Sequence, residues 1–420
     1  MIRDFKEITA ENPVKEVWKL LRFFRDVKFA SEQHRRILNI SEEQYKKHKK
    51  YIEKQAKQIG YCIRQAEEYF QASSQVGLAT RPNLLYYGAV NLSQALILLK
   101  NNGEYSLDLR REQERHKHHG LEFKKSVKDF KPDQGTESFF NLLQCSVYSK
   151  PESDKEQQSQ KQTPWGHFPL FYKSLIPSAY GIPIEIHNPK SGHGILINQG
   201  FFIKKISQSV ANILDIENLL IPNKFNSLEI IKLLPDMYFF LNQVNINPEL
   251  LPGSIKIIEY QNEESEENKR RIEEIHIFSI DKILPNWKSD LKNSYAQRFT
   301  DTQFLILTES DTNISFQLSR QYFPESEDSG FDYPDLVDDI TGRKFYIVKP
   351  ETYIPEPAAH FILLFCLGML CRYYPDIWIK AIDENVQVAE LTDSLLNIIY
   401  RKFPNLILDQ MTETKHYVHS

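Results

Sequence analysis

Glycine and cysteine are both scarce in this 420-residue chain, and their scarcity excludes several kinds of site. There are only 15 glycines, about half the usual share. The glycine-rich patterns of P-loop and dinucleotide-binding proteins are absent, as are the G-x-S-x-G elbow and the H-E-x-x-H zinc motif. The 4 cysteines include no C-x-x-C pair, which argues against a disulfide framework and a cysteine-rich zinc site. The common motifs for phosphate cradling, serine hydrolysis and catalytic zinc are therefore missing.

The sequence also lacks an excess of positive charge, a leader-like segment and a long apolar run. Lys and Arg number 52 against 56 Asp and Glu, so the net charge of −4 excludes a globally basic nucleic-acid binder and leaves room only for a local basic face. Residues 1–11 hold acidic side chains and no apolar stretch. The longest apolar run, residues 361–371, is far shorter than the ~20 residues that span a bilayer. We expect a cytoplasmic protein without a membrane segment, cofactor or metal.

Apolar periodicity predicts helices towards both ends of the chain. Residues 14–27 and 42–73 show helical spacing, with Ser41 as a capping residue for the second helix. Residues 84–99 and 355–374 are apolar on nearly every face, which places both helices at the centre of a core. A final amphipathic helix over 389–403 is expected to be interrupted by Pro404.

The middle of the chain has a different texture. After a polar segment at 149–163, short isoleucine-rich runs, several alternating with period two, predict strands at 194–197, 254–260, 275–280, 304–307 and 344–348. The expected fold class is α+β, with a mainly helical domain formed by the N- and C-terminal regions and a central β-containing module. The expected boundaries are 1–148 for the N-terminal helical region, 164–349 for the β-rich module, and 350–420 for the C-terminal helical region that packs on the first.

Three separated segments carry a family resemblance. Residues 81–92 read RPNLLYYGAVNL, His119-Gly120-Leu121 forms an HGL element, and residues 367–378 contain an RYYP run followed by tryptophan. Their order and spacing resemble the YaaC-like family of bacterial proteins, which is largely uncharacterised, so the resemblance implies a fold and almost no chemistry. The residues that carry this structural family motif are Arg81, Pro82, Tyr86, Tyr87, Gly88, Arg372, Tyr373 and Trp378.

One spacing suggests catalysis. Arg111 and His116 are separated as in the R-x4-H motif of HEPN-type ribonucleases, where an arginine can hold a scissile phosphate and a histidine can transfer a proton without a metal. A solvated charged helix would contain the same spacing by chance. Glu112 also follows the arginine at a position where that motif usually has a small polar residue. The catalytic interpretation and the plain surface interpretation both stay open.

Basic residues supply candidates for nucleic-acid binding. They are Lys46, Lys47, Lys49, Lys50, Arg110 and Arg115, and we expect them on the surface. The preferred interpretation is a non-enzymatic interaction protein with RNA or a protein as partner. The alternative is a HEPN-like, metal-independent ribonuclease acting in stress or anti-phage defence, for which a homodimer could supply paired sites.

Overall fold

The computed structural model describes most of the helical residues and part of the β-rich region. The described ranges are 4–101, 105–131, 134–151, 162–175, 183–187, 194–198, 224–260, 270–278, 304–309, 313–321, 336–347 and 354–419. The chain forms two compact units, each built from separate stretches of sequence. The first consists of Met1–Ala179, Lys205–Ile230 and Ile354–Ser420, and the second of Tyr180–Lys204 and Ile231–Tyr353.

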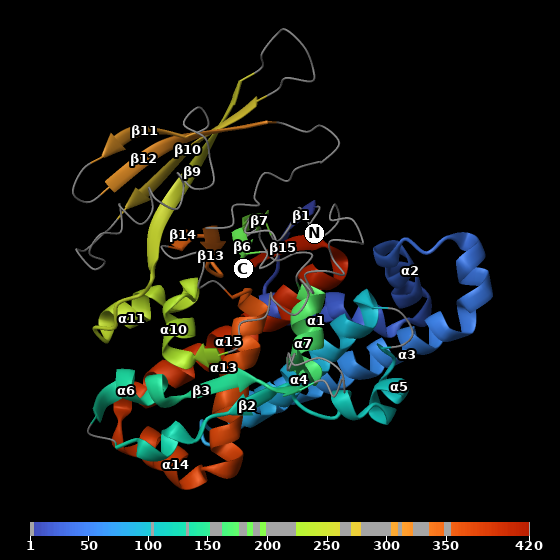
Figure 1. The fold of residues 1–420 in the computed structure, drawn as a ribbon, viewed down its shortest axis with the longest axis horizontal. Helices are drawn as coiled ribbons and strands as arrows, with labels where there is room; N and C mark the ends of the chain where they lie inside the picture. The colour runs from blue at the N-terminus through green and yellow to red at the C-terminus, as the bar shows by residue number, and fades with distance from the viewer. Residues whose placement is uncertain are drawn as a thin grey trace. The chain divides into compact units, whose positions relative to one another are not determined.

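The first unit is a bundle of helices centred on α4. Figure 1 shows α4 beside the long helix α3, and α4 also packs on α2, α7, α13 and α15. The main helices are α1 (Pro13–Arg22), α2 (Val27–Leu38), α3 (Glu42–Ser73), α4 (Arg81–Lys100), α5 (Leu107–Glu112), α6 (Gly135–Leu142), α7 (His167–Leu175), α13 (Glu356–Tyr373), α14 (Pro375–Glu384) and α15 (Val386–Thr412).

The start of α3 follows from local chemistry. The Gln44 backbone N–H donates to Oγ of Ser41 at 3.2 Å, and the Ser41 N–H donates to Oε1 of Gln44 at 3.0 Å. This reciprocal capping box satisfies two backbone donors that would otherwise lack helical partners. The expected cap at Ser41 is therefore present, and the helix ends at Ser73 as its apolar pattern indicated.

Helices α4 and α13 are buried on nearly all sides. Twelve residues of α4 and thirteen of α13 are buried, including Tyr86 and Leu92 on α4 and Phe361 on α13. An all-round apolar helix is stable only when neighbours cover each of its faces. The two helices lie about 270 residues apart in sequence and are in direct contact, with α15 packed on both.

Helix α15 differs from the sequence expectation, because Pro404 does not interrupt it. The helix runs from Val386 to Thr412, with Pro404 buried in its interior. A proline removes one backbone donor and crowds the preceding turn. Buried neighbours on the same helix, such as Phe403 and Ile407, keep the segment packed in the core on both sides of the proline. Tertiary burial therefore outweighs the local preference to end.

Small sheets complete the first unit. Strand β1 (Asp4–Thr9) pairs in parallel with β15 (Thr414–His419), so segments near the two ends of the chain lie side by side (Figure 1). A three-stranded antiparallel sheet has the order β2-β3-β8. Its strands are β2 (Leu121–Phe123), β3 (Gln144–Val147) and β8 (Lys224–Asn226). The ends of the polar segment pair as β4 (Ser149–Pro151) and β5 (Gln162–Pro164), whereas 152–161 lies outside the described residues.

The second unit contains a six-stranded antiparallel sheet with the order β11-β12-β10-β9-β14-β13. Its strands are β9 (Leu250–Tyr260), β10 (Arg270–Phe278), β11 (Phe304–Glu309), β12 (Asn313–Gln321), β13 (Leu336–Asp338) and β14 (Lys344–Ile347). A separate hairpin joins β6 (Pro183–His187) to β7 (Gly194–Asn198). Strands thus occur in each of the five predicted runs; Ser279, Ile280 and Val348, at the ends of two runs, lie outside the described residues.

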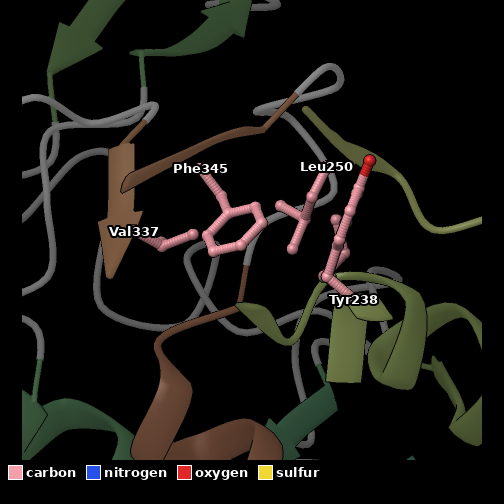
Figure 2. Close-up of a cluster of buried hydrophobic side chains, with 5 residues drawn as sticks. Tyr238, Leu250, Val337 and Phe345 are labelled. Carbon is pink, nitrogen blue, oxygen red and sulfur yellow. The ribbon is translucent and has the colours of Figure 1, made fainter. Parts of the chain in front are cut away.

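A small core lies beneath one end of this sheet. Figure 2 shows the ring of Phe345, from β14, between Val337 of β13 and Leu250 of β9, with Tyr238 of helix α11 (Tyr238–Gln243) on the far side. Leu233 completes the cluster. The side chains come from segments up to about 110 residues apart, so the pairing of β14 with β9 and the packing of α11 stabilise each other.

The described residues confirm a mainly helical α+β fold. Among them, no single helix has the length and apolar character of a membrane span; α13 and α14 pass that test only when taken together, and the pair is bent by 108°. Both helices carry buried side chains, such as Phe361 and Trp378, at the core of the first unit.

Candidate functional site

Arg111 and His116 lie on different short elements. Arg111 is exposed near the end of α5, which stops at Glu112, and His116 is half-buried in the 3-10 turn Glu114–His116. Within the described part of the chain, Arg111 makes no hydrogen bond or ion pair with His116. The ring of His116 instead lies 6.3 Å from that of Tyr105, measured between centroids. One continuous helix face does not present the two residues together.

The basic candidates fall into two groups. Lys46, Lys47, Lys49 and Lys50 are all exposed on the first turns of α3, where Lys49 lies 3.8 Å from Glu53. Arg115 belongs to the same 3-10 turn as His116, and its side chain lies outside the described part of the structure. Arg110 is buried, with 7% of its surface exposed, so the expectation that it lies on the surface is wrong. Its place on α5 turns it towards α3 rather than towards solvent.

The three motif segments converge on one face of the first unit. The hydroxyl of Tyr86, on α4, shares a hydrogen bond of 2.9 Å with Nδ1 of His119. Arg372, at the end of α13, donates from Nη1 to the hydroxyl of Tyr87 at 3.0 Å and from Nε to the carbonyl of Gly368 at 3.2 Å. We call Tyr86, Tyr87, His119, Arg372 and Tyr373 the motif face.

Aromatic rings surround the guanidinium of the motif face. The Cζ atom of Arg372 lies 5.5 Å from the ring centroids of both Tyr86 and Tyr87 and 5.3 Å from that of Tyr373. These distances place the cation against three π systems. Arg372 also donates from Nη2 to Sδ of Met369 at 3.4 Å, and no carboxylate within the described residues pairs with it, so the partners shown for its positive charge are all neutral.

Burial sets the protonation states on this face. Tyr86 is fully buried, which raises the pKa of its hydroxyl and keeps it protonated. Desolvation, followed by the charges of Arg372 and His118, lowers the pKa of His119. His119 is nevertheless exposed over part of its surface. The site therefore offers a neutral, oriented imidazole beside a fixed cation near neutral pH.

The remaining motif residues join α4 to the C-terminal helices. Arg81 donates to Oδ1 of Asp393 at 3.0 Å and to Oδ1 of Asn397 at 2.7 Å, both on α15. Pro82 occupies the first turn of α4, where its missing N–H is harmless. The indole N–H of Trp378, on α14, donates to the Ala79 carbonyl at 3.1 Å.

Gly88 has a steric role in the same helix. A Cβ added there would lie 2.6 Å from the ring of Phe70, on α3. The glycine thus allows α4 and α3 to approach closely at this turn.

A second polar group lies two turns further along α4. Nε2 of His167 lies 2.6 Å from Oγ of Ser93, which donates to the Val90 carbonyl at 2.8 Å. A hydroxyl has a single hydrogen, so Nε2 of His167 is the donor to Ser93. Ser93 is fully buried and already committed to the backbone, which excludes it as a nucleophile.

Two glycines bring the HGL element against the start of α7. The backbone N–H of His167 donates to the carbonyl of His118 at 2.9 Å, and that of Phe168 donates to His119 at 3.0 Å. Gly120 and Gly166 have φ of +85° and +106°, and a Cβ on Gly166 would lie 2.5 Å from Gly120. The two loops can approach this closely only because both residues lack side chains.

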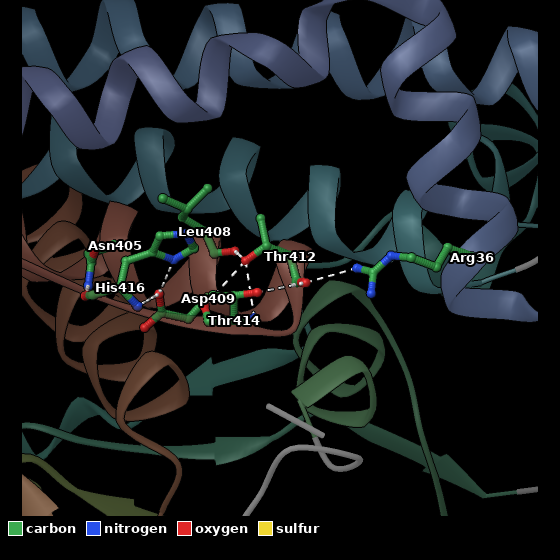
Figure 3. A network of polar contacts seen from close by, with 7 residues as sticks. All are labelled: Arg36, Asn405, Leu408, Asp409, Thr412, Thr414 and His416. Atoms are coloured by element: carbon green, nitrogen blue, oxygen red, sulfur yellow. Dashed lines mark hydrogen bonds and ion pairs between the residues drawn. The ribbon is translucent and has the colours of Figure 1, made fainter. Parts of the chain in front are cut away.

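Two further buried polar groups occur among the C-terminal helices. Figure 3 shows His416 of β15 beside Asp409 of α15, with 2.9 Å between Nδ1 and Oδ1, and Arg36 reaching the Thr412 carbonyl at 2.8 Å. Burial raises the pKa of Asp409. These contacts hold β15 against the end of α15, which is a structural role.

The other group joins α13 to α15. Glu356 lies 2.7 Å from Nζ of Lys402 and 3.6 Å from Nε2 of His360, which is fully buried. Burial, with Lys402 adding to it, holds the pKa of His360 well below its usual range. Across the described ranges, no three or more His, Cys, Asp or Glu residues are grouped so that they could hold a metal ion.

The family motif in the sequence indicated the residues of the motif face, but it did not indicate the nearby pair of Ser93 and His167. The motif itself named Tyr86, His119 and Arg372. Ser93 and His167 gave no comparable signal, because a serine inside an apolar helix and a histidine at a helix start are common in cores.

A protein-family model described as YaaC-like Protein matches residues 24–411, a range that contains all three motif segments. This match confirms the resemblance that those segments indicated. No curated protein and no solved structure matches the chain.

Proposed function

The chain belongs to the YaaC-like family, and from that premise we propose that its motif face binds single-stranded RNA. Proteins hold unpaired bases by stacking them on aromatic or guanidinium planes, and they hold the backbone with cations. The motif face combines both features in residues that come from three separate segments of the chain. The protein acts, on this proposal, as an RNA-associated interaction protein.

The observation that carries the proposal is the setting of Arg372. Its guanidinium is fixed by the Tyr87 hydroxyl and the Gly368 carbonyl, lies among three tyrosine rings, and has no carboxylate partner within the described residues. A structural arginine usually pairs with an acid, as Arg22 does with Glu67 in this unit. Tyr373 is 62% exposed beside it, so the part of its ring that Arg372 does not cover is open for stacking.

Neighbouring cations support the same face. Nζ of Lys128 lies 5.8 Å from the ring centroid of Tyr374, the residue that follows Tyr373. Lys124 and Lys125 belong to the same stretch as Lys128, and Lys125 is exposed. Because the net charge of the chain is −4, affinity for a polyanion must come from such a local cluster.

The experiment measures binding of a fluorescent 12-nucleotide single-stranded RNA by anisotropy at several salt concentrations. We expect Tyr373→Ala to weaken binding about tenfold, since stacking on one base contributes about 1–3 kcal/mol. Tyr61→Ala is the matched control, because Tyr61 is 63% exposed on α3. Equal affinities for the two variants, or no binding by the unmodified protein, would refute the proposal.

A further variant tests the basic start of α3. Replacing Lys46, Lys47, Lys49 and Lys50 together by Glu removes an exposed positive patch without touching the motif face. Weaker binding and a shallower salt dependence would extend the RNA footprint to α3. Unchanged binding would exclude these four lysines from it.

A second candidate function, metal-independent RNA cleavage, is favoured by one observation. His119 is exposed, is oriented by the Tyr86 hydroxyl at Nδ1, and belongs to the same face as Arg372. An imidazole and a guanidinium are what proton transfer at a phosphate needs. Cleavage assays in EDTA with His119→Ala and His116→Ala separate this face from the predicted Arg111–His116 pair. Cleavage that persists in both variants, or that needs a divalent metal, would contradict both the His119–Arg372 assignment and the Arg111–His116 assignment.

A further inference from the structure

Arg110 is a buried cation for which the described residues show no carboxylate partner. Only 7% of the residue is exposed, and its Nε and Nη2 atoms are buried with no hydrogen-bond partner. Leaving a guanidinium unpaired in a protein interior is costly, because the charge loses its hydration and gains nothing in return. The described residues therefore leave at least two donors of one rigid group unused.

The nearby acid is already engaged. Asp108, two residues before Arg110 on α5, accepts from Nζ of Lys54 at 2.5 Å and from Nε2 of Gln58 at 2.8 Å. Those contacts, both from side chains of α3, lower the pKa of Asp108 and keep its carboxylate ionised. The carboxylate thus serves the α3–α5 contact and is not a partner of Arg110.

Cys62 and His167, two described groups that interact with Arg110, are both neutral. Burial raises the pKa of the Cys62 thiol to about 12, so this thiol carries no charge that could neutralise the guanidinium. Arg110 also adds to the lowering of the pKa of His167, an effect that His116 and His119 share. Among the described residues, Cys62 of α3 and His167 of α7 thus bring no negative charge to Arg110 of α5.

We propose that Arg110 anchors an internal site for a phosphate group, supplied either as free phosphate or by a nucleotide. The planar guanidinium presents Nε–H and Nη–H donors in a fork that matches two oxygens of one oxyanion. The Cys62 thiol and the His167 imidazole are both neutral, so neither repels an oxyanion, and the guanidinium of Arg110 supplies the positive charge that would hold it. This site is separate from the stacking surface proposed for RNA and does not depend on it.

The test compares thermal unfolding in inorganic phosphate and in chloride at equal ionic strength and pH. We expect phosphate to raise the Tm of the unmodified protein by about 3 °C or more at concentrations far above Kd, because a ligand of the native state stabilises it by mass action. A second arm replaces phosphate with a nucleoside 5′-monophosphate. A response to phosphate assigns the site to the free anion, and a response to the nucleotide alone assigns it to a nucleotide.

Two neighbouring arginines provide the variant and its control. Arg110→Met keeps the side-chain length and removes the charge, so its Tm in chloride should equal or exceed that of the unmodified protein, and its response to phosphate should disappear. Arg111→Met, altered at the exposed neighbour, should keep the response. Tyr373→Ala should also keep it, which separates this site from the RNA proposal.

Equilibrium dialysis of radiolabelled phosphate against the unmodified protein and Arg110→Lys gives a second readout if Arg110→Met does not fold. We expect one phosphate bound per chain in the unmodified protein and at least tenfold weaker binding in Arg110→Lys, because an ammonium cannot form the two-pronged contact. No binding of either ligand to the unmodified protein, or equal binding by both proteins, would overturn the proposal. So would a large loss of Tm for Arg110→Met in chloride without any effect of phosphate.

Discussion

Buried histidines make the stability of the first unit depend on pH. His34, His167 and His360 all have a pKa below the usual histidine value, chiefly because burial disfavours the charged ring. In the unfolded chain each would titrate near its ordinary value of about 6.5. The unfolded state therefore binds more protons than the native state once the pH falls below that value, and acid favours unfolding.

Replacing His360 should reduce this acid sensitivity. Each such histidine lowers the free energy of unfolding by up to about 1.4 kcal/mol per pH unit below pH 6.5. Between pH 7 and pH 5, the free energy of unfolding of His360→Met should fall by about 1–2 kcal/mol less than that of the unmodified protein. Glu356 keeps its contact with Lys402 in this variant. Urea unfolding at each pH measures the effect, with His48→Met, altered at an exposed position of α3, as the control. The same pH slope in all three proteins would show that His360 does not contribute.

Position 120 requires glycine for two reasons, a positive φ and the lack of room for a Cβ atom. At Gly120, φ is +85°, and a Cβ would lie 2.5 Å from Cδ of Pro169 and 2.7 Å from the backbone N of Phe168. Gly135 has a similar φ of +82° but nothing within 4 Å of an added Cβ. We expect Gly135→Ala to cost about 1–2 kcal/mol from backbone strain alone, and Gly120→Ala about 3 kcal/mol or more. Chemical denaturation checks this, and equal losses would mean that the loop contact can relax.

At the scale of elements, replacing two helix glycines by alanine should change the free energy of unfolding in opposite directions. A Cβ at Gly88 would overlap the buried ring of Phe70, whereas at Gly368 the nearest atom is Cβ of Tyr86, 3.5 Å away. Gly88→Ala should lower the free energy of unfolding by about 1–3 kcal/mol through overpacking. Gly368→Ala should raise it by up to about 1 kcal/mol, because alanine favours the helix. Losses of similar size at both sites in thermal unfolding would contradict this account.

Elements with a strong internal pattern could be predicted from the sequence. Helices α4 and α13 and the isoleucine-rich strands occur where periodicity placed them, and Ser41 caps α3 through a local motif. The continuation of α15 through Pro404 could not be predicted from the sequence, because packing against distant segments decides whether a proline ends a helix. The pairing of β1 with β15 joins residues about 410 apart, and no local pattern encodes such a contact.

The candidate site divides in the same way. The motif segments identified Tyr86, His119 and Arg372, but only the structure shows that these residues meet. Charge alone suggested that Arg110 is exposed, like Arg111. The bonds of Leu107 and Asp108 to Gln58 hold the short helix α5 against α3, and this distant contact cannot be read from a run of basic residues.

At the scale of the whole molecule, the first unit depends on both ends of the sequence. Helix α4 packs on α13 and α15, which follow it after more than 250 residues. A fragment of residues 1–349 lacks both helices and would expose much of α4, so we expect it to be insoluble or molten. Co-expression of residues 350–420 should restore solubility, as sedimentation and near-UV circular dichroism would show. A fragment 1–349 that melts cooperatively would demonstrate that the N-terminal helices bury themselves.

The parallel pairing of β1 with β15 also determines how the first unit would respond to mechanical force. Asp4 lies opposite Thr414 and Thr9 opposite His419, so tension applied at Asp4 and His419 pulls the two strands along their length in opposite directions. In that shear geometry the cross-strand hydrogen bonds carry the load together, whereas an antiparallel pair pulled from one end opens bond by bond. The β1–β15 pair would thus resist extension first, before the tension reaches the helices of the first unit.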